Sequence, residues 1–462
     1  MKEITRVDGL KIAYIGGGSR GWARGFMSDL ASAEDISGDV YLYDIDFEAA
    51  KCNEFIGNKV KTLDGVKSVW NYKAVPTMAE ALTGADFVII SILPGTFDEM
   101  ESDVHAPEKY GIYQSVGDTT GPGGILRALR ALPMMEEIAK GVKEYCPSAW
   151  VINYTNPMTL CVSQLYRTFP QIKAFGCCHE VFSAQWHIAL VLAQECGLRV
   201  EKDFNRRDIN INVAGVNHFT WITQAHYKNY DVFEAYRRHC EKFVSIETGP
   251  AIGAPRDPFV CTEKVKMDLF LRTGVIAAAG DRHLAEFCPG KWYLSSPRQA
   301  DELRFGLTSV ASRKKEREEL LEKTRRLVSG EEEVQLKCTD EEGVRMIRSL
   351  LGLEDFVTNV NFPNRGQIAG LPLGAVVETN AYFCADNIRP VLSGPLPPQV
   401  NQLVSKICNE QLTILDAVEK RDLELAFFAF CSDPLVTCSK EDARALFDEM
   451  VENTKEYLTM YF

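Results

Sequence analysis

The sequence lacks long apolar runs and has no excess of positive charge. Its 462 residues carry 51 Lys and Arg against 64 Asp and Glu, a formal net charge of −13. The strongest apolar runs, such as residues 87–93, fall far short of the roughly 18 apolar residues that a membrane-spanning helix needs. Nucleic-acid binders usually present a basic face, and none is visible here. We therefore expect neither a membrane nor a nucleic acid as a partner.

The sequence also lacks a disulfide framework and an apolar leader of the signal-peptide type. Its 14 cysteines are scattered, without CxxC pairs. Scattered thiols in a chain of this length are typical of a reducing compartment. These features predict a cytoplasmic protein in which most cysteines are small buried apolar side chains.

Short apolar runs alternate with amphipathic segments through the first half of the chain. We predict helices over residues 48–60 and 125–143, and strands at residues 11–15, 40–43, 87–93, 150–153 and 172–175. This alternation is typical of a doubly wound parallel sheet. The sequence thus predicts an α/β fold whose N-terminal domain, residues 1–200, is Rossmann-like.

The second half is less regular and predicts a mixed α+β domain over residues 201–462. Strand-like runs occur at residues 209–216 and within residues 357–377. Helices are predicted at residues 316–328, 331–351, 399–416 and 440–457. We expect this domain to complete the binding site and to contribute to oligomerisation.

A glycine-rich loop follows the first predicted strand and precedes a helical segment. Gly16, Gly18 and Gly21 have the GxGxxG spacing, and Ser19 lies within the loop. The glycines allow a tight turn and a close approach of the backbone to a pyrophosphate, which the helix N-terminus then binds. These four residues are therefore candidate cofactor-binding residues, although a ligand-free turn would have the same pattern.

An acidic residue ends the second predicted strand, where such folds bind the adenosine ribose. Asp44 can accept hydrogen bonds from the ribose hydroxyls, and Asp46 is the alternative. A carboxylate at this place would repel a 2′-phosphate. The sequence therefore predicts NAD rather than NADP as the cofactor.

Three polar clusters each follow a predicted strand. Residues 153–158 read NYTNPM, residues 176–180 read GCCHE, and residues 216–219 read VNHF. The first can bind hydroxyl groups or simply form a turn and helix cap. Cysteine and histidine in the other two are natural metal ligands, but a buried cysteine pair and a packed histidine would look the same.

These clusters together resemble glycoside hydrolase family 4, the NAD- and metal-dependent glycosidases. The resemblance runs along nearly the whole chain and is strongest toward the bacterial α-galacturonidase branch, which is associated with pectin breakdown. Besides the glycine loop and the three clusters, the motifs that carry it are GIYQSVGDTTGPGGILRALRALP (residues 111–133), AAGDRHLAEF (278–287), VTNVNFPNRGQI (357–368) and LPLGAVVETNA (371–381).

The resemblance implies a divalent metal, typically Mn²⁺, held by Cys178 and His218. It also implies a sequence of oxidation, elimination, addition and reduction in place of the usual carboxylate pair. NAD oxidises the sugar at C3, a base removes the C2 proton, the aglycone leaves, water adds, and the hydride returns. The expected base is Asp268, and the expected acid for the leaving group is His179.

A uronate substrate carries a carboxylate that needs cationic or hydrogen-bonding partners. Arg282 and His283 are the expected partners, with Arg127 and Arg130 as rivals. The resemblance places three further residues near the sugar and cofactor, namely Gln114, Asp118 and Asn156.

Several functions remain open on the sequence alone. α-Glucuronidase or α-galactosidase activity would need the same family motifs, and an NAD-dependent dehydrogenase would need only the cofactor site. The expected partner is a small uronate glycoside. Members of the family are commonly dimers or tetramers, so a homodimer or homotetramer is expected.

Overall fold

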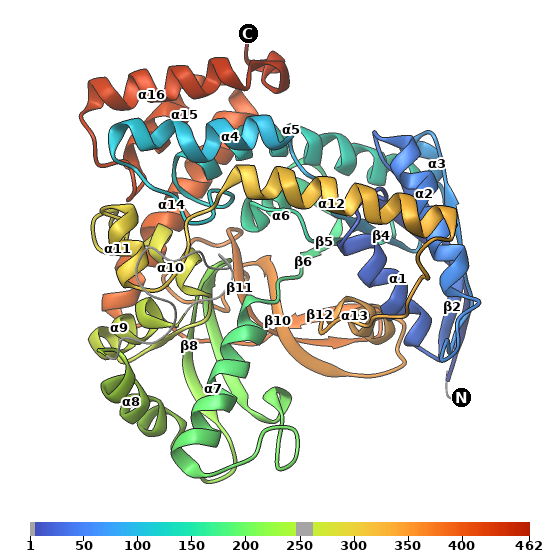
Figure 1. The fold of residues 1–462 in the computed structure, drawn as a ribbon, viewed down its shortest axis with the longest axis horizontal. Coiled ribbons are helices and arrows are strands. Elements are labelled where there is room, and N and C mark those ends of the chain that lie inside the picture. Colours follow the sequence, from blue (N-terminus) through green and yellow to red (C-terminus); the bar gives the residue numbers. More distant parts are fainter. Residues whose placement is uncertain (1–4, 246–261) are drawn as a thin grey trace.

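The computed structural model describes residues 5–245 and 262–462, and one mixed sheet runs through it (Figure 1). Along the sheet the order is β3-β2-β1-β4-β5-β6-β10-β11-β7-β8-β9, with β12 paired to β11. The strands are β1 (Val7–Ile15), β2 (Ile36–Tyr43), β3 (Trp70–Ala74), β4 (Phe87–Ile90), β5 (Trp150–Asn153), β6 (Lys173–Gly176), β7 (Asn210–Val216), β8 (Phe219–His226), β9 (Ile276–Ala277), β10 (Phe356–Pro363), β11 (Val376–Cys384) and β12 (Asn387–Pro390).

The first six strands are parallel and have the 3-2-1-4-5-6 order of a dinucleotide-binding fold. The helices are α1 (Trp22–Ser32), α2 (Phe47–Val60), α3 (Met78–Leu82), α4 (Phe97–His105), α5 (Gly121–Tyr145), α6 (Met158–Thr168), α7 (Glu180–Cys196), α8 (Val232–Phe243), α9 (Lys264–Thr273), α10 (Asp281–Phe287), α11 (Pro297–Glu302), α12 (Val310–Ser329), α13 (Gly343–Leu350), α14 (Pro398–Lys420), α15 (Leu423–Ser432) and α16 (Lys440–Asn453). The predicted Rossmann-like fold is confirmed.

Strand β1 is buried on both faces, because helices cover both sides of the parallel strands. Ile12 and Tyr14 pack toward α1 and α13, and the Tyr14 ring lies 5.8 Å from that of Phe26. Ala13 and Ile15 point the other way and pack with residues of α5 and α6. Alternate side chains of a strand point to opposite faces, so the continuous apolar run of residues 12–15 places two residues in each core.

The second half of the chain extends the same sheet rather than starting a separate one. Strand β10 runs antiparallel to β6, with Asn361 opposite Gly176. A side chain at position 176 would overlap the Met158 sulfur, so glycine allows this close packing. Strand β6 and the loop that follows it therefore lie beside a strand contributed by residues 201–462.

The predicted helix over residues 331–351 is wrong for its first part, whereas that over residues 316–328 is confirmed within α12. Only α13, residues 343–350, is helical. Thr339 instead fixes the preceding segment against α1: its amide and hydroxyl both donate to the Asp29 carboxylate, at 2.7 and 2.6 Å. Long-range hydrogen bonds outweigh the helix propensity of the charged residues there.

Across the described residues, no helix has both the length and the apolar character required to cross a membrane. The cysteines within the described ranges are all free thiols.

Candidate active site

The loops at the carboxyl ends of the parallel strands contain many of the residues that the sequence predicted to be functional. Open α/β sheets bind ligands at this edge, where the strand order reverses. Here the reversal lies between β1 and β4, and the glycine-rich loop follows β1.

The glycine-rich loop packs closely against the residues that follow β4 and β2. Gly16 has φ of +90°, and a Cβ at this position would lie 2.0 Å from the carbonyl oxygen of Ser91. A Cβ on Gly18 would lie 2.8 Å from an Asp44 carboxylate oxygen. The first two glycines are therefore required by the packing, while Gly21 has open space around it.

Asp44 and Asp46 have different roles at the end of β2. The Asp44 carboxylate accepts hydrogen bonds from the amides of Gly18 at 2.8 Å and of Asp46 at 2.9 Å. Asp46 caps helix α2 by accepting from the amide of Ala49. Asp44 thus stays the prediction for the ribose contact, since Asp46 is already used as a helix cap.

The N-terminus of α1 completes a cradle that fits a pyrophosphate. Within the described residues no side chain caps α1 at Gly21. The Ser19 amide donates to the Gly16 carbonyl, and the Ser19 carbonyl accepts from Asn53, so the loop has a fixed shape. Amides at an uncapped helix start are suited to an anion.

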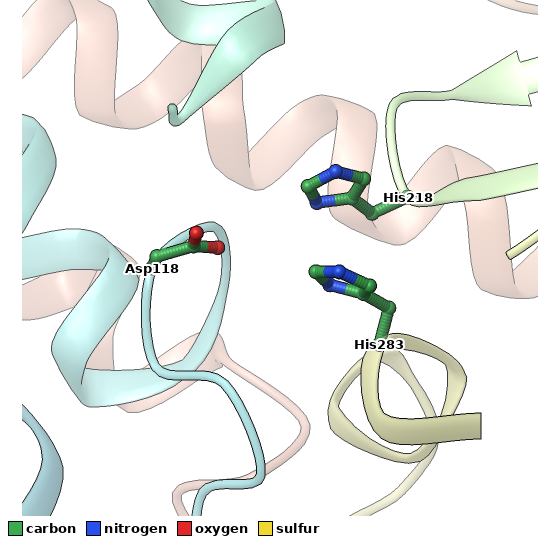
Figure 2. Close-up of side chains that lie close together, drawn as sticks. All are labelled: Asp118, His218 and His283. Carbon is green, nitrogen blue, oxygen red and sulfur yellow. The ribbon is translucent and has the colours of Figure 1, made fainter. Parts of the chain in front are cut away.

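Asp118, His218 and His283 point toward one another from three separate elements (Figure 2). Asp118 lies on the loop before α5, His218 in the tight turn between β7 and β8, and His283 on α10. Their candidate ligand atoms all lie within 4.8 Å of one another. Carboxylate and imidazole are both ligands that suit Mn²⁺, so these residues fit a divalent metal.

Neighbouring groups favour the ionised Asp118 carboxylate, and burial favours the neutral His218 imidazole. Burial raises the pKa of Asp118, but the adjacent His218, His283 and Arg127 outweigh it and lower that pKa to about 2. Burial, and then the neighbouring His283, lower the pKa of His218 to about 3. These are the protonation states that metal ligation requires.

Comparison with known proteins assigns the family. The family 4 glycosyl hydrolase domain matches residues 11–194, and the C-terminal domain of the same family matches residues 213–436. The chain belongs to glycosyl hydrolase family 4. It is a glycosidase by family.

Relatives resemble this family 4 hydrolase along nearly its whole length. An α-galacturonidase from Thermoanaerobacterium saccharolyticum is 59% identical, covering 98% of this chain and 97% of that protein. A Bacillus subtilis crystal structure, named as a glucosidase, is 49% identical with a TM-score of 0.90 over 96% of this chain and all of its own. A Thermotoga maritima 6-phospho-β-glucosidase, solved with manganese, NAD⁺ and glucose-6-phosphate, shares the fold at 23% identity and a TM-score of 0.74 over 97% of this chain and 99% of its own.

Cys178 of the family 4 hydrolase is buried on the loop after β6. Its carbonyl accepts from the Asn359 side chain at 3.2 Å, and burial raises the pKa of its thiol. Among the described residues, the group of candidate metal-binding side chains consists of Asp118, His218 and His283, and it does not include Cys178. Cys178 therefore stays a predicted ligand, whereas His218, the other predicted ligand, belongs to the group of three.

His179 lies next to Cys178 and faces a cavity of about 330 Å³. Its Nδ1 lies 2.8 Å from Glu341, and this contact raises the pKa of the imidazole. The Trp22 ring stacks on His179 at 5.9 Å between centroids. Gly21 and Tyr154 also line the cavity, which therefore begins beside the glycine-rich loop.

Asp268 lies on α9, outside the group of three. Its Oδ2 accepts hydrogen bonds from Arg272 at 2.7 Å and from the Tyr293 hydroxyl at 2.6 Å. Asp268 is thus a half-buried carboxylate that one residue of its own helix and the buried Tyr293 hold in place. The structure therefore does not bring the predicted base together with Asp118 and the two histidines.

Arg282 and Gln114 bind mainly backbone atoms. The Arg282 guanidinium donates to the Ser115 carbonyl, the Gly306 carbonyl and the Thr308 hydroxyl. The Gln114 Nε2 donates to the Asp103 carbonyl, and its Oε1 accepts from the Gly123 amide. Both side chains fix the loop that carries Asp118, a role that their sequence positions did not reveal.

Arg127 is better placed for a ligand than Arg130. Arg130 forms a buried bidentate ion pair with Asp103. Arg127 uses Nε to bond the Asn156 carbonyl at 3.1 Å and lies within electrostatic range of Asp118. Asn156 in turn donates its side-chain amide to Asp118 at 3.2 Å, so Asn156 and Arg127 both border the group.

Sequence reasoning missed two buried residues around the site. The Glu286 carboxylate accepts hydrogen bonds from the amides of Val116 and Gly117, at 2.7 and 2.9 Å. Burial raises the pKa of Glu286 to about 8. Thr119 bonds both Asp118 and His218. The one available signal was that each lies inside a family motif, since neither has a distinctive residue spacing.

Proposed function

We propose that this family 4 glycosidase hydrolyses α-D-galacturonides with NAD and Mn²⁺. The observation that carries the substrate is the 59% identity to an α-galacturonidase over 98% of the chain. The glycine-rich cradle with Asp44 supports NAD, and the carboxylate–imidazole group supports a divalent metal. A cytoplasmic location and a homodimeric or homotetrameric state remain predictions from the sequence.

The residues supply binding, orientation and proton transfer around these groups. When bound, NAD supplies a hydride acceptor and donor at the sugar's C3, and the metal supplies a Lewis acid at its hydroxyls. Asn156 binds a sugar hydroxyl beside Asp118. His179 donates a proton to the glycosidic oxygen, and its contact with Glu341 keeps that proton available. Asp268 was predicted to accept the C2 proton, and this role stays a prediction, since Arg272 and Tyr293 engage its Oδ2 outside the group of three.

Arg127 is our candidate for the uronate carboxylate. Its side chain is largely buried, and among the described residues its one hydrogen bond is through Nε. The terminal nitrogens are thus left for a ligand. A guanidinium fork matches a carboxylate in geometry as well as charge. Arg282, in contrast, has its Nε and Nη2 engaged by Ser115, Gly306 and Thr308.

Replacing Arg127 with methionine should lower kcat/KM for a galacturonide by about 10²-fold or more, because a buried charged partner of the carboxylate is lost. The measurement is a pair of kcat/KM values, one for 4-nitrophenyl α-D-galacturonide and one for the α-D-galactoside. The galactoside lacks the carboxylate, so its low rate should change by less than tenfold.

Arg282→Ala is the matched comparison for Arg127→Met. Because Arg282 anchors the loop that carries Asp118, its loss should reduce activity on every substrate alike. If Arg282→Ala instead reduced only uronide hydrolysis while Arg127→Met had no effect, the carboxylate would belong to Arg282.

The function itself is tested by hydrolysis of three 4-nitrophenyl glycosides, the α-D-galacturonide, the α-D-glucuronide and the α-D-galactoside. Assays would contain NAD⁺, Mn²⁺ and a thiol reductant, with each omitted in turn from protein stripped of cofactor. We expect cleavage of the galacturonide that requires all three additions, without net NADH formation.

The alternatives give different results in the same assay. Preferential cleavage of the glucuronide or galactoside would replace the substrate but keep the family chemistry. Net NADH formation from a hydroxy acid, without glycoside cleavage, would favour a dehydrogenase and overturn the proposal.

A further inference from the structure

We propose that Asp118 and His283, together with His218, are protein ligands of the metal, so that the ligand set extends beyond the predicted Cys178 and His218. This inference rests on the proposed function, because it concerns the metal that the proposed function requires. Asp118 and His283 were predicted to bind the sugar. Their placement beside His218 favours the metal as their primary partner (Figure 2).

The hydrogen bonds of His218 leave its Nε2 free for a metal. The Thr119 hydroxyl donates its one hydrogen to Asp118 Oδ1 at 2.6 Å. That hydroxyl also lies 2.9 Å from His218 Nδ1, so Nδ1 must carry the proton and donate to it. The Nε2 lone pair is then unprotonated, and this is the state in which histidine binds metals.

His283 has a nitrogen without a protein partner. Its Nδ1 is buried and makes no hydrogen bond with the described residues. Its Nε2 lies 3.9 Å from Glu180, beyond hydrogen-bond distance. A buried polar atom without a partner destabilises the protein. A bound cation would remove this cost.

The spacing of the three side chains is close to that of ligands around one ion. Two ligands on opposite sides of a metal, each about 2.1 Å away, are about 4.2 Å apart. The candidate atoms here lie within 4.8 Å, so small side-chain movements suffice. The two imidazoles already lie side by side, with ring centroids 3.8 Å apart and planes 32° apart.

Neighbouring residues fix His283 in this position. Glu180, at the start of α7, accepts the Gly280 amide at 2.7 Å, directly before α10. The start of the helix that carries His283 is therefore tied to the loop that carries Cys178. One carboxylate and two imidazoles also suit Mn²⁺ better than a thiolate-rich set, which favours Zn²⁺. The ligand set thus matches the metal of the proposed function.

The test is a titration of the NAD-loaded protein with Mn²⁺ in the absence of sugar. Binding is measured from the electron paramagnetic resonance signal of the Mn²⁺ that stays free. His283→Ala and Asp118→Asn should each raise the Kd by about tenfold or more, since even outer residues of metal sites contribute about 10–100-fold. His239→Ala, a histidine in α8 outside the group of three, should leave the Kd unchanged. His283→Glu replaces one ligand with another and should recover most of the affinity, which a merely structural role would not allow.

Each outcome separates this inference from the proposed function. An unchanged Mn²⁺ Kd in His283→Ala, with a raised KM for the galacturonide, would return His283 to the sugar and overturn the inference alone. Failure of His283→Glu to recover any affinity, with a native circular dichroism spectrum, would also overturn it. Absence of Mn²⁺ binding by the wild-type protein would overturn the metal dependence of the proposed function, and the ligand set with it.

Discussion

Replacing His218 with alanine is expected to lower kcat/KM for the galacturonide by about 10³-fold or more. Lewis-acid stabilisation by a metal contributes several kcal/mol to a transition state, and each 1.36 kcal/mol is about tenfold in rate. His218 belongs to the group that gathers at the site, and it also contacts Thr119. Hydrolysis and Mn²⁺ binding should therefore be lost together.

NAD binding separates a local effect of His218→Ala from misfolding. The glycine-rich loop follows β1, whereas His218 lies in the turn between β7 and β8, so NAD binding measured by calorimetry should persist. Cys178→Ser tests the predicted thiolate ligand in the same way. Full activity of Cys178→Ser without added metal would remove Cys178 from the metal site.

Replacing Gly16 with alanine is expected to abolish NAD binding and to destabilise the fold. The added Cβ would lie 2.0 Å from the Ser91 carbonyl oxygen, and φ of +90° is unfavourable for any residue with a side chain. Backbone strain of this kind costs about 1–3 kcal/mol, and the overlap adds to it. Thermal unfolding and NAD titration would measure both effects.

Gly21→Ala is the control for Gly16→Ala, because it changes the same motif without the overlap. Gly21 has φ of −104° and nothing within 4 Å of an added Cβ. The unfolding temperature of the Gly21→Ala protein should stay close to that of the wild type. Equal destabilisation by both substitutions would show that the packing around Gly16 is not the cause.

Much of the fold was predictable because local patterns determined it. The apolar run at residues 11–15 must be covered on both faces, and the glycines that follow fix a tight turn before a helix. The same reasoning failed for residues 331–342, since the hydrogen bonds of Thr339 to Asp29 connect residues 310 positions apart. Helix propensity contains no information about such a partner.

The candidate site was predictable to the extent that its residues follow strands. Cys178 and Asp44 were found because they closely follow β6 and β2, and parallel strands bring their carboxyl ends to one edge. The roles of the arginines were not predictable in this way. Arg127 and Arg282 are the same residue type in equally plausible motifs, and their different partners decide between them.

The sequence by itself determined the α/β fold of the first half, the glycine-rich cradle and the family, because each depends on residues close together in the chain. Only the tertiary structure decided that the second half extends the same sheet, that Asp268 is held by Arg272 and Tyr293, and that Asp118, His218 and His283 meet. The physical reason is that these contacts join a loop, a hairpin turn and a helix whose positions are set by packing across the whole chain.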